Sequence, residues 1–188
     1  MYRADNGSST VASVVTTRTI TAVTPSSFIV HNESGVSSGD TQWTCDAHGI
    51  ASTQLNAGGG STAGVVMNVV KSSGISLPLE ADWTAGRAWD TAYDVTLSGK
   101  ATGTGRITSH STIVAQEQVA VVAGTYTAWR VDTVTTQDLS MSMGGAAARP
   151  FHFQVPTTSW YAKGVGVIKT QSSVGVAGSS SQLISYTP

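Results

Sequence analysis

The segment "TSWYAKGVGVIKTQ", residues 158–171, repeats the layout of "TQWTCDAHGIASTQ", residues 41–54. In both, a threonine stands two residues before a tryptophan, a glycine follows that tryptophan by six residues, and Thr-Gln closes the match. Each copy is preceded by two strand-like runs joined by a short turn. Two copies are too few for a solenoid, which needs three or more repeats. The echo therefore predicts a curved antiparallel sheet or half-barrel built from two halves, residues 11–55 and 106–172.

Strand patterns dominate the rest of the chain, so the predicted fold class is all-β with minor helix. β-branched residues alternate with small or polar ones, and clusters of Gly, Pro, Asn and Ser separate the runs. The predicted strands cover residues 11–23, 28–34, 64–71, 92–99, 106–122, 125–136, 150–156 and 181–187. Helical spacing of apolar residues occurs only briefly, over residues 77–90. We expect an irregular connection at residues 56–91, with mobile loops at residues 56–64 and 143–150.

Length and charge limit the possible classes of protein. The 188 residues fit a single domain spanning 1–188. Charged residues are 11% of the chain, with a net charge of −1 and no run of either sign, which excludes a nucleic-acid-binding surface as a working hypothesis. Cys45 is the single cysteine, so no intrachain disulfide can form.

The sequence shows no transmembrane segment, because no apolar run approaches the roughly 18 residues that span a bilayer. The start "MYRADNGSST" lacks the layout of a signal peptide. We expect an extracytoplasmic location, either secreted, periplasmic or on the cell surface, for a chain whose leader is absent from this numbering.

Three blocks resemble segments of bacterial exported proteins of uncharacterised function. They are "WTCDAHGI" at residues 43–50, "VVAGTYTAWRV" at residues 121–131 and "WYAKGVGVIK" at residues 160–169. The resemblance implies a curved sheet similar to the half-barrels of lipoprotein carriers of the LolA/LolB type, whose apolar concave face can hold a lipid. This chain lacks the lipobox and the clear lid helices of that pattern. The family has no established catalytic residues to carry over.

No complete catalytic or metal-binding set can be assembled from the residues, so we predict a non-enzymatic protein without cofactor or metal. There is no Gly-x-Ser-x-Gly elbow, and His110 reads as a surface strand position. Cys45, Asp46 and His48 could hold zinc in principle, but zinc normally takes three or four protein ligands and a second cysteine is absent, so a polar turn is favoured.

An acidic cluster borders two tryptophans, Trp83 and Trp89. Carboxylates beside aromatic rings are typical of carbohydrate sites, so sugar binding stays open at this point. Tryptophans in a small all-β domain more often fill the core, and that interpretation is favoured. The cluster consists of Glu80, Asp82, Asp90 and Asp94.

The expected function is binding of a lipid or another hydrophobic or amphipathic small molecule on the concave face of the sheet. The candidate ligand-binding residues are Trp43, Trp129, Trp160 and Tyr161. The candidate turn glycines are Gly49, Gly124, Gly164 and Gly166. The alternative is a structural subunit of an extracellular assembly or cell-surface layer, which would self-associate through edge strands.

Overall fold

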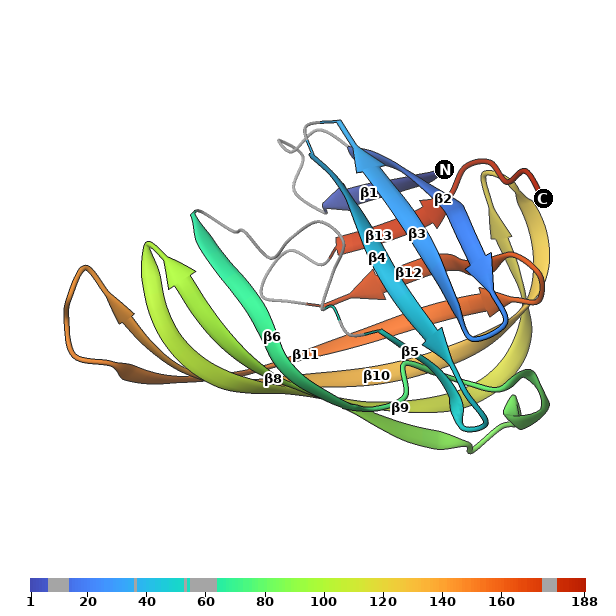
Figure 1. Ribbon diagram of the computed structural model, residues 1–188. Coiled ribbons are helices and arrows are strands. Elements are labelled where there is room, and N and C mark those ends of the chain that lie inside the picture. Colours follow the sequence, from blue (N-terminus) through green and yellow to red (C-terminus); the bar gives the residue numbers. More distant parts are fainter. Residues whose placement is uncertain (7–13, 36, 53, 55–63, 174–178) are drawn as a thin grey trace.

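The computed structural model describes residues 1–6, 14–35, 37–52, 54, 64–173 and 179–188, and it shows one curled antiparallel sheet (Figure 1). The strands are β1 (Tyr2–Asn6), β2 (Val14–Thr24), β3 (Ser27–Ser34), β4 (Ser37–Cys45), β5 (Gly49–Ser52), β6 (Val65–Gly74), β7 (Leu77–Pro78), β8 (Ala88–Gly99), β9 (Ala101–Val121), β10 (Gly124–Met143), β11 (Arg149–Ala162), β12 (Gly166–Ser172) and β13 (Ser179–Leu183). Their spatial order is β6-β8-β9-β10-β11-β12-β13-β1-β2-β3-β4-β5-β7. The prediction of an all-β, curved antiparallel half-barrel is confirmed.

The predicted strands are present, and most are longer than the sequence pattern indicated. The helical spacing at residues 77–90 gives only η1 (Glu80–Asp82), a single 3₁₀ turn, because Pro78 and Gly86 flank too short a segment for an α-helix. The connection predicted to be irregular contains β6, β7, η1 and the start of β8 among its described residues. Most of the loop predicted at residues 56–64 lies outside the described residues.

The two edges of the sheet meet at one end of the curl, next to Ile75 and Ser76. The backbone N–H of Ile75 donates to the carbonyl of Asp90 on β8 at 3.2 Å, whereas that of Ser76 donates to Ile50 on β5 at 2.7 Å. The side chains of β8 add two bonds here, from Thr91 Oγ1 to the Ile75 carbonyl at 2.5 Å and from Trp89 Nε1 to the Ser76 carbonyl at 3.1 Å. The connection between β6 and β7 therefore joins the edge strands to each other.

Alternation along β8 separates an inner from an outer face of the sheet. Every odd-numbered residue from Trp89 to Leu97 is buried, while the even-numbered ones are exposed or partly exposed. The odd side faces the opposite wall, since the Tyr93 hydroxyl donates to the Ser52 carbonyl on β5 at 3.3 Å. The pairing register carries this inner face from β8 through β9 and β10 to β11.

Three apolar clusters stabilise the sheet. The arm cluster covers β6, β8, β9 and β10 and contains Tyr93, Val95, Leu97, Ile107 and Leu139. The aromatic cluster has Trp89, Ile113 and Val131 at its centre, with Ile75, Trp83, Trp129 and Tyr161 packed around them. The tip cluster joins the β9–β10 hairpin tip to β11, β12 and β13 through Val119, Ala128, Trp160, Ala162, Ile168 and Leu183.

The two echoing segments occupy equivalent places in the chain order. One runs β2, β3, β4 and β5, the other β9, β10, β11 and β12, and in both a tryptophan-bearing strand leads through a glycine turn into the next strand. All four predicted turn glycines have positive φ angles: Gly49, Gly124, Gly164 and Gly166. At Gly49 a Cβ atom would overlap the carbonyl oxygen of Leu77. Glycine is thus required there by close approach as well as by backbone angle.

Candidate ligand-binding face

Trp129 and Tyr161 are cross-strand partners on the inner face, on β10 and β11 respectively. Both pack into the aromatic cluster. Trp83 arrives from the connection after η1, and its ring lies 5.2 Å from that of Tyr161 and 6.5 Å from that of Trp89. Its indole N–H donates to the Pro78 carbonyl at 3.3 Å, which fixes the ring in this position. One end of the inner face is therefore lined by aromatic rings from four segments of the chain.

Trp43 belongs to the wall formed by β3, β4 and β5. It pairs with Phe28 on one side and Ser52 on the other, and its ring stacks on Phe28 with centroids 5.9 Å apart. Following the register through β13, β1 and β2 places Trp43 on the same inner face as Tyr161. Its buried Nε1 atom has no hydrogen-bond partner among the described residues. A buried N–H without an acceptor is rare in folded proteins, which distinguishes this atom from the other buried side-chain donors of the described residues.

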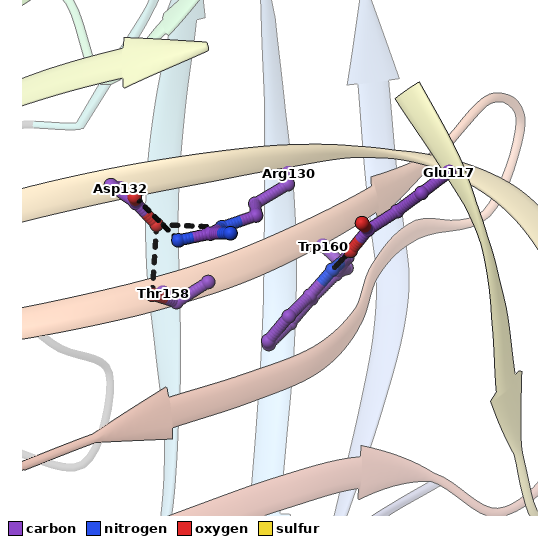
Figure 2. Close-up of polar contacts among 5 residues, drawn as sticks. All are labelled: Glu117, Arg130, Asp132, Thr158 and Trp160. Carbon is purple, nitrogen blue, oxygen red and sulfur yellow. Dashed lines mark hydrogen bonds and ion pairs between the residues drawn. The ribbon is translucent and has the colours of Figure 1, made fainter. Parts of the chain in front are cut away.

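Trp160 lies on the outer face, unlike the other three predicted ligand-binding residues, because it precedes Tyr161 on β11 and points to the opposite side. Figure 2 shows Trp160 beside Glu117. It is 8% exposed and belongs to the tip cluster. Its indole N–H donates to a carboxylate oxygen of Glu117, and the ammonium of Lys169 lies 5.0 Å from the ring centroid. Its polar atom is satisfied and its ring is covered, which makes Trp160 a structural residue of the outer side.

A polar network continues from Trp160 along the same outer face (Figure 2). Arg130 binds Asp132 through two nitrogens, at 3.1 and 2.8 Å, and Thr158 Oγ1 donates to Asp132 at 2.8 Å. The Asp132 hydrogen bond and charge, followed by the charge of Glu117, raise the pKa of Arg130. A groove of about 500 Å³ lies beside this network. Its lining includes the outer-face residues Asp132, Val134, Pro156, Thr158 and Gln171, the alternating residues Thr133, Thr157 and Ser172, and Ser173.

A band of hydroxyl groups crosses the inner face between the arm cluster and the aromatic cluster. On β9 and β10, Ser109 pairs with Thr135 and Ser111 with Thr133, both at 2.9 Å. On β11 and β12, Thr157 contacts Ser172 and Ser159 contacts Thr170, both at 3.5 Å. These eight residues form the hydroxyl band. It is flanked along β9 by Ile107 of the arm cluster and Ile113 of the aromatic cluster.

Burial raises the pKa of Tyr161, and two smaller effects oppose the rise. These are a hydrogen bond with Ser159 and the positive charge of Arg18 on β2. Arg18 therefore lies close enough to the aromatic cluster for its field to reach Tyr161. The Tyr161 phenol is kept neutral and is a hydrogen-bonding group, and it does not act as an ionised nucleophile at neutral pH.

The other residues weighed for chemistry are engaged in separate local contacts. Asp46 Oδ1 accepts hydrogen bonds from the backbone N–H groups of His48 at 2.7 Å and Gly49 at 3.2 Å, and the His48 bond is the main reason its pKa is lowered. This is the polar turn that the sequence favoured. His110 lies on the outer face and contacts Asp90 at 2.8 Å. Among the described residues, no three His, Cys, Asp or Glu side chains come together as a metal site would require.

The acidic cluster of the sequence is dispersed in space. Asp90 pairs with His110, Asp94 with Arg106 at 2.6 Å, and Glu80 with Lys163. Trp83 and Trp89 lie on the inner side, whereas Asp90 and Asp94 lie on the outer face of the same strand as Trp89. Asp90 and Asp94 therefore do not share a face with Trp83 and Trp89.

Sequence reasoning missed Phe28, Trp83, Trp89 and the hydroxyl band as parts of the inner face. Phe28 reaches it as the cross-strand partner of Trp43 on the next strand, whereas Trp83 reaches it through Tyr161, which is distant in sequence and is not revealed by the strand pattern. The hydroxyl band could have been found from the sequence. Ser109 and Ser111 stand at alternate positions between Ile107 and Ile113, so period-2 alternation places all four residues on one face of the strand.

Within the described part of the chain, no helix has the length and apolar character needed to cross a membrane. No known family's sequence profile matches this chain, and a comparison with curated proteins finds no match either. A search of solved structures finds a protein of Parabacteroides distasonis ATCC 8503 described as a "putative lipoprotein", with a TM-score of 0.63 and 13% sequence identity. The likeness covers 98% of this chain and 92% of that one. The chain thus shares the curled-sheet fold of that protein, and this match does not single out the LolA/LolB type.

Proposed function

We propose that this chain is an extracytoplasmic, non-enzymatic domain that binds an amphipathic or hydrophobic small molecule on the inner face of its sheet. The observation that carries the proposal is the Trp43 indole N–H, which is buried on that face and has no acceptor in the part of the chain that the structure describes. Leaving a buried donor unpaired costs about 1–3 kcal/mol. A bound molecule that supplies an acceptor would remove that cost.

The surroundings of Trp43 suit the apolar part of such a molecule. Phe28 stacks on it, and Trp129 and Tyr161 lie on the same face of the opposite wall. Aromatic side chains offer large apolar contact areas, and Trp and Tyr each add one polar atom. Such surfaces are typical of sites for ligands with both apolar and polar parts.

The proposed location is the cell envelope. It is supported by the similarity of the whole fold to a protein described as a "putative lipoprotein". The neutral, hydroxyl-rich composition, with 11% charged residues, suits a domain that binds its ligand on the inner face of the sheet.

The test uses the purified protein, a lipophilic fluorescent dye, and native mass spectrometry of copurified molecules. We expect dye binding that is weakened by Trp43→Phe and Trp129→Ala. The matched control is Trp160→Phe, which changes a tryptophan on the outer face and should leave dye affinity unchanged. Absence of dye binding and of any copurified amphiphile in the unmodified protein would refute ligand binding.

The alternative of a self-associating subunit rests on the edge strand β6. Val66 and Val70 are 43% and 68% exposed there, as expected for a strand that pairs with another chain. A bulge at Val70 and the adjacent Lys71 interrupt the same edge, and both are common means of preventing edge pairing. Size-exclusion chromatography over a range of protein concentrations separates the two proposals, since the ligand-binding domain needs no polymer.

A further inference from the structure

Building on the proposed function, we infer that the head group of the ligand is uncharged and carries several hydroxyl groups, as in a glycolipid. The inference starts from how the sheet distributes charge. The inward-facing residues from Trp89 to Leu97, Ala101 to Ile113 and Trp129 to Met141 include no acidic, basic or histidine side chain. The outer face of the same three strands carries Asp90, Asp94, Arg106, His110, Arg130, Asp132 and Asp138.

This separation disfavours a charged head group over the middle of the inner face. A phosphate, carboxylate or ammonium group loses hydration when it is buried, and it needs an opposite charge to recover the loss. The described inner face of β8, β9 and β10 offers none. On the opposite wall, Arg18 of β2 is the cation whose charge reaches Tyr161, which hydrogen-bonds to Ser159 at that end of the hydroxyl band.

The hydroxyl band supplies the hydrogen bonds that an uncharged polyhydroxyl group requires. Each hydroxyl has one donor and two acceptor sites. In the Ser109–Thr135 and Ser111–Thr133 pairs one hydrogen is used between the two oxygens, which leaves one donor and several lone pairs per pair for a ligand. A sugar-like group both donates and accepts, so it matches this supply better than an anion, which only accepts.

The order of residues along the strands places apolar surface on either side of the hydroxyl band. On β10 the hydroxyl residues Thr133 and Thr135 lie between Val131 of the aromatic cluster and Leu139 of the arm cluster. A head group on the band would have apolar surface on both sides for a chain. The unpaired N–H of Trp43 on the opposite wall adds one more donor for an oxygen of the ligand.

The experiment compares probes with the same dodecyl chain and different head groups: dodecyl maltoside, dodecanoate and dodecylphosphocholine. Binding of each monomeric probe to the full chain is measured below its micellar concentration by calorimetry and tryptophan fluorescence. We expect dodecyl maltoside to bind about tenfold more tightly than either charged probe. Equal or tighter binding of a charged probe would overturn the head-group inference and leave the proposed function standing. Failure of all three to bind would overturn both.

Paired variants locate the effect on the band. Thr133→Val combined with Thr135→Val keeps the shape of the side chains but removes two hydroxyls, and it should weaken dodecyl maltoside severalfold while leaving dodecanoate unchanged. The control is Thr102→Val combined with Thr104→Val, which removes two exposed hydroxyls from the outer face of β9. If the double variant on β10 does not fold, Thr157→Val on β11 tests the same point. Unchanged maltoside affinity in a folded variant would contradict the inference.

Discussion

The ring of Trp43 lies parallel to that of Phe28, with centroids 5.9 Å apart and planes 2° apart, while its buried N–H has no partner among the described residues. Trp160, the equivalent tryptophan in the echoing segment, lies on the opposite face, and its N–H donates to Glu117. The two residues therefore share a position in the repeated layout but differ in side and in hydrogen bonding.

This difference predicts that a Trp→Phe substitution lowers the free energy of unfolding by different amounts at positions 43 and 160. Trp43→Phe keeps an aromatic ring against Phe28 and removes an unpaired donor, so the free energy of unfolding should change by less than about 1 kcal/mol. Trp160→Phe loses a hydrogen bond to a charged group and should cost about 1–3 kcal/mol. Urea denaturation of the ligand-free protein measures both. An equal loss in the two variants would contradict the assignment of Trp43 as unsatisfied.

Gly49 and Gly166 follow the two tryptophans at the same spacing but tolerate side chains differently. Gly49 has φ of 149° and no room for a Cβ beside Leu77, while Gly166 has φ of 93° and open space around it. Gly49→Ala should therefore cost roughly 2–5 kcal/mol, from backbone strain and overlap together. Gly166→Ala should cost roughly 1–2 kcal/mol, from backbone strain alone. Thermal unfolding of both variants measures the two losses of stability. A larger loss for Gly166→Ala than for Gly49→Ala would contradict the prediction.

Tyr161 predicts a loss of stability at alkaline pH. Its raised pKa means that the folded protein keeps the phenol proton when the unfolded chain, with an ordinary tyrosine pKa of about 10, has begun to lose it. The folded state then binds more protons, so the free energy of unfolding falls as the pH rises above about 10. Tyr161→Phe should flatten this decline. Tyr186→Phe, at a residue 44% exposed, is the control and should leave the decline in place.

The outer face carries a transverse row of charged and ionisable side chains on four neighbouring strands. The register aligns Asp94, Arg106, Asp138 and His152 from β8 to β11, and Arg106 contacts Asp94 at 2.6 Å. These side chains are all substantially exposed, so Arg106→Gln should cost no more than about 1 kcal/mol, and the cost should shrink in high salt. A large loss that salt does not change would indicate a buried role for Arg106.

Local pattern was enough to predict the fold class and most strands. Period-2 alternation at residues 92–99 identified β8, and the same alternation separates Asp94 from Tyr93 and Val95. The same alternation also shows that the four candidate ligand-binding residues cannot all lie on one face. Trp160 and Tyr161 are consecutive on one strand, so both could not line the same face.

The pairing of distant strands could not be predicted in the same way. Trp83 meets Tyr161, and Tyr93 meets Ser52, only because the sheet curls and its edges meet near Ile75. These contacts depend on register and on bulges, such as the one between Arg130 and Val131, which shift the alternation by one residue. The location of the inner face is therefore a property of the assembled sheet.

The pairing of β1 with β13 has a consequence for the order of folding. Tyr2 pairs with Leu183, so the first and last strands form a seam in the interior of the strand order, visible beside the N and C labels of Figure 1. During synthesis the N-terminal strands cannot join the C-terminal ones until nearly all of the described chain has emerged. Pairings of such long range slow folding and leave strand edges open meanwhile. Deleting β13 should accordingly open the sheet between β12 and β1, leaving its two parts joined only near Ile75 and Ser76, and should promote aggregation more than any single substitution described above.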